Sequence, residues 1–156
     1  LHVVPGGRSL SQLQRAVDMK IVDVRTSGDA TIVVVAVSNT GSGHKVPGGM
    51  SSHNIRLEVK VDRGTRVERQ ERVYERVLTD AAGKKIEVVS RLFTDATAVR
   101  SDNRIAPGEV RRERFIFSPV GRSEAIEARL IYVTQPPWPG AEKREVQIWR
   151  EVKQTR

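Results

Sequence analysis

Short segments in which apolar and polar residues alternate recur along most of this chain of 156 residues. The clearest covers residues 54–62, where one set of alternate positions is aliphatic and the other is charged. Because successive side chains of a strand point to opposite faces, this pattern predicts a half-buried β-strand. The inward set is Ile55, Leu57, Val59 and Val61, and the outward set is Arg56, Glu58 and Lys60.

Further segments with strand character follow one another at hairpin spacing, separated by turn residues such as Ser27-Gly28-Asp29. They predict an all-β fold, an immunoglobulin-like antiparallel β-sandwich of about seven or eight strands. The prolines of residues 135–140 exclude a strand interior there, and residues 94–103 read as a polar connection. The predicted strands cover residues 19–26, 30–38, 67–78, 86–93, 110–118, 124–134 and 146–152.

Individual segments carry more specific expectations. Residues 30–38 are the most β-branched and predict a central strand buried on both faces. Residues 67–78 carry charges that would also suit a helix. Residues 146–152 predict an edge strand. We expect Phe115 and Phe117 to share one face, and the next strand to point Ile126, Ala128, Leu130 and Tyr132 inward.

The first part of the chain follows a different period. Leu10, Leu13, Ala16 and Val17 have helical spacing, and Ser9 stands where a helix cap is expected. We therefore predict a short amphipathic helix over residues 9–18 that covers one end of the sandwich. The predicted organisation is an N-terminal segment with this helix over residues 1–18, and a β-sandwich domain over residues 19–156.

Composition narrows the classes of partner. The formal charge of +8 arises from 27 basic and 19 acidic residues that are mixed along the chain. We therefore expect a solvated basic surface or an acidic protein partner, and no nucleic acid. No run of apolar residues is long enough to span a membrane. There is no cysteine, which excludes disulfides, cysteine ligands and covalent haem attachment within this chain.

Three histidines are candidates for site chemistry. His44 lies in the glycine-rich loop of residues 39–49 (NTGSGHKVPGG), where glycines allow a bulky flat group to approach the backbone. Its imidazole suits a metal or haem ligand; from the spacing alone, a tight turn in which it only caps a carbonyl is the favoured alternative. His2 precedes Pro5-Gly6-Gly7 at a terminus that would ordinarily fray. His53 precedes a predicted strand and is expected at the surface or as a strand-edge hydrogen-bond donor.

Motifs of a self-sufficient enzyme are missing from the sequence. There is no nucleophile elbow, no phosphate-binding loop and no dinucleotide fingerprint, since Gly41-Ser42-Gly43 lacks the third glycine. Asp95 and Asp102 show no paired-carboxylate pattern, and no metal motif with two spaced ligands is present. We predict that the chain is not an enzyme.

Four segments, in order, resemble the C-terminal β-domain of exported multihaem c-type cytochromes. They correspond to His-x-Phe-Pro-Gly-Gly, to an Asn-x-Gly-x-Gly-His-x-x-Pro-Thr-Gly loop, to an Arg-x-Ile-x-Pro-Gly-Glu turn and to an alternating strand. The chain departs from this pattern at Val4, which replaces Phe, at Gly48, which replaces Thr, and in lacking haem-attaching cysteines. The matching segments are residues 2–7 (HVVPGG), 39–49, 104–109 (RIAPGE) and 128–132 (ARLIY).

The resemblance implies an electron-transfer accessory domain or subunit that packs against haem c held by an upstream region or a partner chain. It implies a periplasmic or extracellular location. In this setting His2 is the first candidate for a distal iron ligand and His44 the second, while Lys45 and Arg8 are candidates for pairing with haem propionates.

An alternative interpretation requires no cofactor. A β-sandwich of this kind can act as a binding or scaffolding subunit that joins proteins together. Trp138 and Trp149 would then be natural interface anchors, because buried aromatic side chains dominate many protein interfaces. Their alternative role is ordinary packing.

Overall fold

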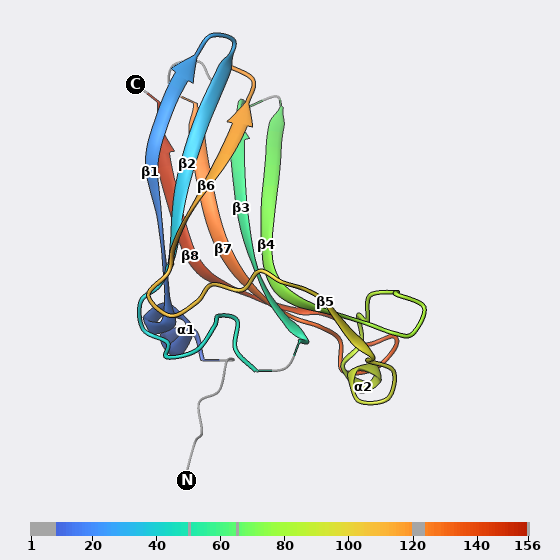
Figure 1. Cartoon of the computed structure of the whole chain (residues 1–156). Helices are drawn as coiled ribbons and strands as arrows, with labels where there is room; N and C mark the ends of the chain where they lie inside the picture. Colours follow the sequence, from blue (N-terminus) through green and yellow to red (C-terminus); the bar gives the residue numbers. More distant parts are fainter. Residues whose placement is uncertain (1–8, 50, 65, 120–123, 156) are drawn as a thin grey trace.

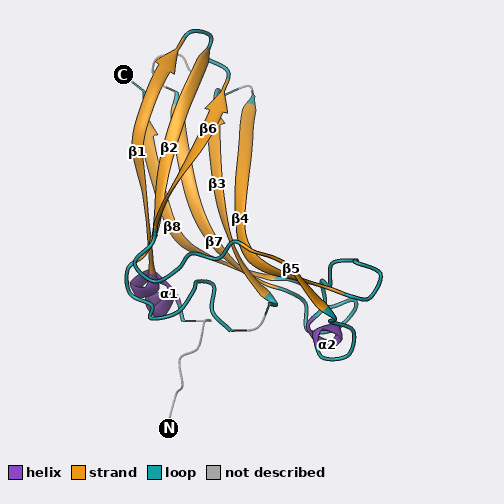
Figure 2. Ribbon diagram, viewed as in Figure 1, coloured by secondary structure: helices purple, strands orange, loops and turns teal. Residues whose placement is uncertain are grey.

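The computed structural model describes residues 9–49, 51–64, 66–119 and 124–155. Within these ranges eight strands form two antiparallel sheets, preceded by a short helix, so the predicted β-sandwich is confirmed (Figures 1 and 2). One sheet has the order β1-β2-β6 and the other β5-β4-β3-β7-β8. The elements are α1 (Leu10–Ala16), β1 (Val17–Ser27), β2 (Ala30–Asn39), β3 (His53–Asp62), β4 (Val67–Thr79), α2 (Val89–Leu92), β5 (Ala98–Asp102), β6 (Val110–Phe117), β7 (Ala125–Thr134) and β8 (Arg144–Gln154).

The core lies between the two sheets and follows the predicted alternation. All four inward residues of β3 are fully buried, and Phe115 and Phe117 of β6 are buried on one face as expected. In β7 the predicted inward residues Ile126, Ala128, Leu130 and Tyr132 are also buried. β8 lies at the edge of the five-stranded sheet, as predicted. Burial of aliphatic side chains from both sheets is therefore the main stabilising term.

Strand β2 is central in its sheet, as predicted, but it is not buried on both faces. Val33, Val35 and Val37 are fully buried, whereas Val34 and Ala36 on the opposite side are half-exposed. Along this part of the strand, the residues that the structure describes cover the outer face of the three-stranded sheet only partly. Its β-branched content reflects the strand conformation rather than burial on both sides.

Two further predictions are wrong at the same end of the molecule. Residues 86–93 form a loop and the short helix α2 instead of a strand, and residues 94–103 contain the edge strand β5. The first N–H groups of α2, at Val89 and Ser90, donate to the carbonyls of Pro136 and Pro137 at 3.0 and 3.1 Å. This long-range contact outweighs local β propensity. All residues of β5 are exposed, so no alternation marked it in the sequence.

Side-chain hydrogen bonds bridge the two sheets along their open sides. A bulge in β1 exposes the backbone of Ile21, whose N–H donates to Glu151 at 2.7 Å and whose carbonyl accepts from Lys153 at 2.6 Å. On the other side, the Tyr74 hydroxyl of β4 donates to Glu113 of β6 at 3.1 Å. The two contacts at Ile21 also satisfy backbone groups of the edge strand β1 that would otherwise be open to pairing with another chain.

Helix α1 covers one end of the sandwich, as predicted (Figure 1). Leu13 is buried in the core, and Gln14 donates to the carbonyl of Ile148 in β8 at 3.1 Å. Trp149 of β8 donates from its indole to the carbonyl of Val17 at 2.7 Å. Ser9 occupies the cap position, but its side chain makes no capping bond to the helix. Packing on β8 therefore holds the helix, rather than a side-chain cap.

The outer face of the five-stranded sheet carries a charge cluster centred on Glu127. This carboxylate is 4% exposed and lies against Arg129, Arg150 at 2.7 Å and Lys60 at 3.7 Å. Burial alone would raise the pKa of Glu127, but the hydrogen bonds from Arg150 and Arg129 outweigh it, and the pKa lies below its ordinary value of 4.5.

The lowered pKa of Glu127 predicts acid sensitivity. A carboxyl with a depressed folded-state pKa contributes stability above its ordinary value and loses it as the pH falls through the folded-state pKa. We expect Glu127→Gln to lower the free energy of unfolding at pH 7 by roughly 2 kcal/mol and to flatten its decline below about pH 4.5. Urea denaturation between pH 7 and pH 3 measures both effects. Glu71→Gln, at a more exposed carboxylate on the same sheet, is the control and should change little.

Candidate functional site

The glycine-rich loop after β2 is fixed by the buried side chain of Asn39. Its amide donates to the carbonyls of His44 and Ile105, at 2.8 and 3.1 Å, and accepts from the N–H of Ser42 at 3.1 Å. The loop and the turn of residues 104–109 are also paired directly, because Val46 and Ile105 exchange two backbone hydrogen bonds of 2.8 and 2.9 Å. Two of the motifs noted in the sequence therefore form one structural unit.

Glycine is required at two positions of this loop by close approach. A Cβ atom at Gly41 would lie 1.8 Å from the carbonyl oxygen of Arg15 in α1, and one at Gly48 would lie 2.3 Å from the His44 ring. The first contact lets the loop run directly against the helix, and the second lets the imidazole lie on bare backbone. The loop is thus built around α1 and His44.

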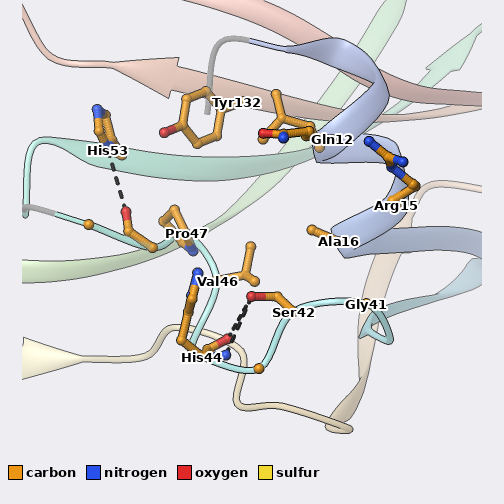
Figure 3. A pocket seen from close by; sticks show the side chains of 14 residues that line it. Gln12, Arg15, Ala16, Gly41, Ser42, His44, Val46, Pro47, His53 and Tyr132 are labelled. Atoms are coloured by element: carbon orange, nitrogen blue, oxygen red, sulfur yellow. Dashed lines mark hydrogen bonds between the residues drawn. The ribbon is translucent and has the colours of Figure 1, made fainter. Parts of the chain in front are cut away.

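A pocket of about 650 Å³ opens between α1, the loop and the start of β3 (Figure 3). His44, His53 and Tyr132 border it, together with Arg15 from the helix. Three segments of the family-like pattern therefore contribute to the same end of the sandwich: the loop and Tyr132 line the pocket, and the turn braces the loop. The fourth segment contains His2 and, with Arg8, lies outside the described residues.

The His44 side chain is exposed and oriented by its own loop. Its Nδ1 lies 2.9 Å from the carbonyl oxygen of Lys45. Because a carbonyl only accepts, Nδ1 must carry the proton, and the neutral ring then presents its lone pair at Nε2. Histidine ligands of metals are commonly oriented by such a bond from the other ring nitrogen. The arrangement suits a ligand, and the carbonyl contact is also what the alternative, a structural turn, predicted.

His53 takes part in the pocket wall, which the sequence did not indicate. Its ring centroid lies 5.3 Å from that of Tyr132 in a tilted arrangement, and its Nδ1 lies 3.5 Å from the carbonyl oxygen of Gly48. The expectation of a surface or strand-edge residue is met only in part, since His53 is half-buried at the first position of β3.

The cations near the pocket differ from those selected in the sequence. The ammonium of Lys45 lies 3.3 Å from the carboxylate of Asp102, so it contacts the end of β5. Two hydrogen bonds from Arg104, each of 2.8 Å, also bind Asp102 and hold its pKa well below the usual range. Arg15 lines the pocket instead. No signal in the sequence marked Arg15, because it lies on the polar, exposed side of the predicted helix.

The structure also bears on the predictions about the two tryptophans, a metal site and a membrane span. Trp149 packs against the core, whereas Trp138 is 63% exposed. Within the described ranges no three His, Asp or Glu side chains cluster as a metal site. In the same ranges no helix is both long and apolar enough to cross a membrane.

Comparisons with known proteins agree with the fold. No protein family and no curated protein matches the sequence. Among solved structures, a penta-haem cytochrome c552 from Thermochromatium tepidum superposes with a TM-score of 0.74 over 96% of the chain, at 18% identity. The fold resembles a domain of that multihaem cytochrome. The chain spans 42% of its length.

Two weaker similarities carry no argument about this chain. A putative ApaA protein from Bordetella pertussis matches 90% of the chain and 96% of its own length, at 13% identity and a TM-score of 0.43. β-Glucosidase 3B from Thermotoga neapolitana matches 88% of the chain and 16% of its own length, at 12% identity and a TM-score of 0.32.

Proposed function

We propose that this chain is an electron-transfer accessory domain or subunit of an exported multihaem c-type cytochrome assembly, without catalytic activity of its own. Its role is to pack against a haem and to offer a histidine to the iron. The observation that carries the proposal is His44, whose Nδ1 is bound to a backbone carbonyl and whose Nε2 is the remaining ligand atom, at the border of the pocket.

The residues around this pocket fit a haem edge in chemistry. Leu13, Val46 and Pro47 supply apolar surface, Tyr132 supplies an aromatic ring and Arg15 supplies a cation for a propionate. The chain has no cysteine, so the haem c would be held by an upstream region or a partner chain. When bound, the haem supplies the one-electron chemistry, at a potential that ligation and burial tune.

His2, Lys45 and Arg8 keep their proposed roles from the sequence pattern. His2 is the other candidate ligand, and Arg8 is a candidate for a propionate; neither lies in the described residues. Lys45 would reach a propionate only by leaving Asp102. The likeness of the fold to a domain of a penta-haem cytochrome c552 supports the proposal without deciding these contacts.

A haem undecapeptide tests the ligand role directly. This c-type haem fragment already carries one histidine on the iron and has its other axial position open. We expect the whole chain to bind it and to change its absorption to that of a low-spin, bis-histidine haem, since a pocket imidazole completes the ligation. We expect His44→Ala to weaken this binding by at least tenfold.

Matched variants separate the candidates. His2→Ala tests the second proposed ligand, and His53→Ala tests the wall histidine, which should retain the low-spin spectrum. If His2→Ala alone abolishes the change, the ligand is His2. The ligand role is contradicted if His2→Ala and His44→Ala both still give the low-spin spectrum of the unaltered chain. It is also contradicted if the unaltered chain does not change the spectrum of the haem undecapeptide.

A further inference from the structure

A second pocket, of about 620 Å³, lies beyond His53, which borders both cavities. It is formed by the proline-rich segment after β7, the start of β8 and Val89 of α2. None of its other lining residues belongs to the pocket of the glycine-rich loop. Its lining includes Gln135, Trp138, Glu142, Lys143 and Arg144.

The backbone that carries Trp138 is fixed on both sides. Pro136 and Pro137 accept hydrogen bonds from the first N–H groups of α2, and the Trp138 carbonyl accepts from the N–H of Ala141 at 3.1 Å. Nevertheless, the tryptophan side chain is 63% exposed. A large flat ring that stands in solvent on a fixed backbone offers stacking surface at a low cost in backbone ordering.

Gln135 lines the same pocket, and the oxygen of its side-chain amide lacks a hydrogen-bond donor among the described residues. Its side chain is 8% exposed, and its Oε1 is buried without a hydrogen-bond partner among the described residues. The backbone N–H of Gln135 donates to the carbonyl of Ser52 at 2.7 Å, which anchors the residue. Because Oε1 is enclosed, a ligand hydroxyl would reach it only after the Gln135 side chain rotates toward the pocket, and that rotation would give an unpaired buried acceptor its hydrogen bond.

The charges at the pocket entrance are predominantly positive. Lys143 and Arg144 are exposed and form no ion pair within the part of the chain that the structure describes, and Glu142 is the acidic residue among them. The pocket therefore combines an aromatic platform, one acceptor in need of a donor, and two cations that suit an anion.

We infer that this pocket binds a carboxylated sugar ring, a hexuronate unit of an acidic polysaccharide. The C–H face of the ring would stack on Trp138, a hydroxyl would donate to Gln135 and the carboxylate would lie near Lys143 or Arg144. A neutral sugar leaves the cations unused, and an aromatic acid brings no donor for Gln135. The inference does not depend on the proposed haem role.

Calorimetric titration of the whole chain with a galacturonate trisaccharide tests this inference, with cellotriose and benzoate as comparison ligands. We expect the uronate to bind more tightly than either. Trp138→Ala should weaken its binding by about tenfold, because the stacking contact is lost. Phe93→Ala, at an aromatic residue that is 73% exposed outside the pocket, is the control and should leave binding unchanged.

Two further variants test the polar contacts. Lys143→Gln combined with Arg144→Gln should abolish the preference for galacturonate over cellotriose. Gln135→Leu should weaken galacturonate binding severalfold without lowering stability, since it removes an unpaired acceptor. No uronate binding at millimolar concentration, equal binding by Trp138→Ala, or tighter binding of benzoate would overturn the inference.

Discussion

Replacement of Gly41 by alanine is expected to lower the free energy of unfolding by about 2–3 kcal/mol, although it adds a single methyl group. The new Cβ would lie 1.8 Å from the carbonyl oxygen of Arg15, and the atoms in its way are helix backbone, which cannot rotate aside. The loop or α1 must therefore move. Because α1 and the loop both line the pocket, binding of the haem undecapeptide should weaken as well.

Gly43, two residues further along the same loop, is the matched control. A Cβ there meets nothing within 4 Å. Gly43→Ala should therefore change stability by less than about 1 kcal/mol, and it can even be favourable because alanine restricts the unfolded chain. Urea denaturation of both variants makes the comparison. Equal stability of Gly41→Ala and Gly43→Ala would show that α1 does not rest on the loop as described.

Removal of the Asn39 side chain is expected to lower the free energy of unfolding by as much as Gly41→Ala does, or by more. Asn39→Ala loses three hydrogen bonds and leaves the carbonyls of His44 and Ile105 with fewer donors, in a place where Asn39 itself is fully buried. We expect a loss of about 3 kcal/mol by urea denaturation, together with loss of the fixed orientation of His44.

Two other substitutions sharpen this result. Asn39→Asp keeps the shape and the acceptor for Ser42 but removes both donors and places a carboxylate against two carbonyl oxygens, so it should be at least as harmful as alanine. Asn103→Ala removes two comparable bonds, to Val73 and Glu75, at an exposed site where water can replace them. Its cost should stay near 1 kcal/mol. An Asn39→Asp variant as stable as the unaltered chain would contradict the role of the Asn39 amide in fixing the loop.

The predictable part of the fold was the part in which one face of a strand is buried. Segments such as residues 54–62 and 124–134 alternate because their inward side chains meet the opposite sheet, and both strands were found where expected. Segments without that asymmetry were misassigned. β5 is exposed throughout, and α2 is held by the carbonyls of Pro136 and Pro137, about fifty residues away in the sequence.

The sequence indicated several segments of the candidate site but not how they are arranged in space. The loop around His44 was noted for its glycines, and the turn of residues 104–109 for its similarity to a known pattern. Their direct pairing through Asn39, Val46 and Ile105 was not foreseeable, since it depends on hydrogen bonds between residues about sixty positions apart. For the same reason Arg15 and Tyr132 were missed as pocket residues.

The sequence by itself determined that this chain is an antiparallel β-sandwich with a short N-terminal helix, because the alternation of side chains is a local consequence of which face is buried. It also determined that any covalent haem must be held elsewhere, because there is no cysteine. Only the tertiary structure decided that His44, Arg15 and Tyr132 share one pocket and that Lys45 pairs with Asp102. These contacts join residues that are far apart in the sequence, so they depend on how the sheets and the helix pack. Local periodicity carries no information about that packing.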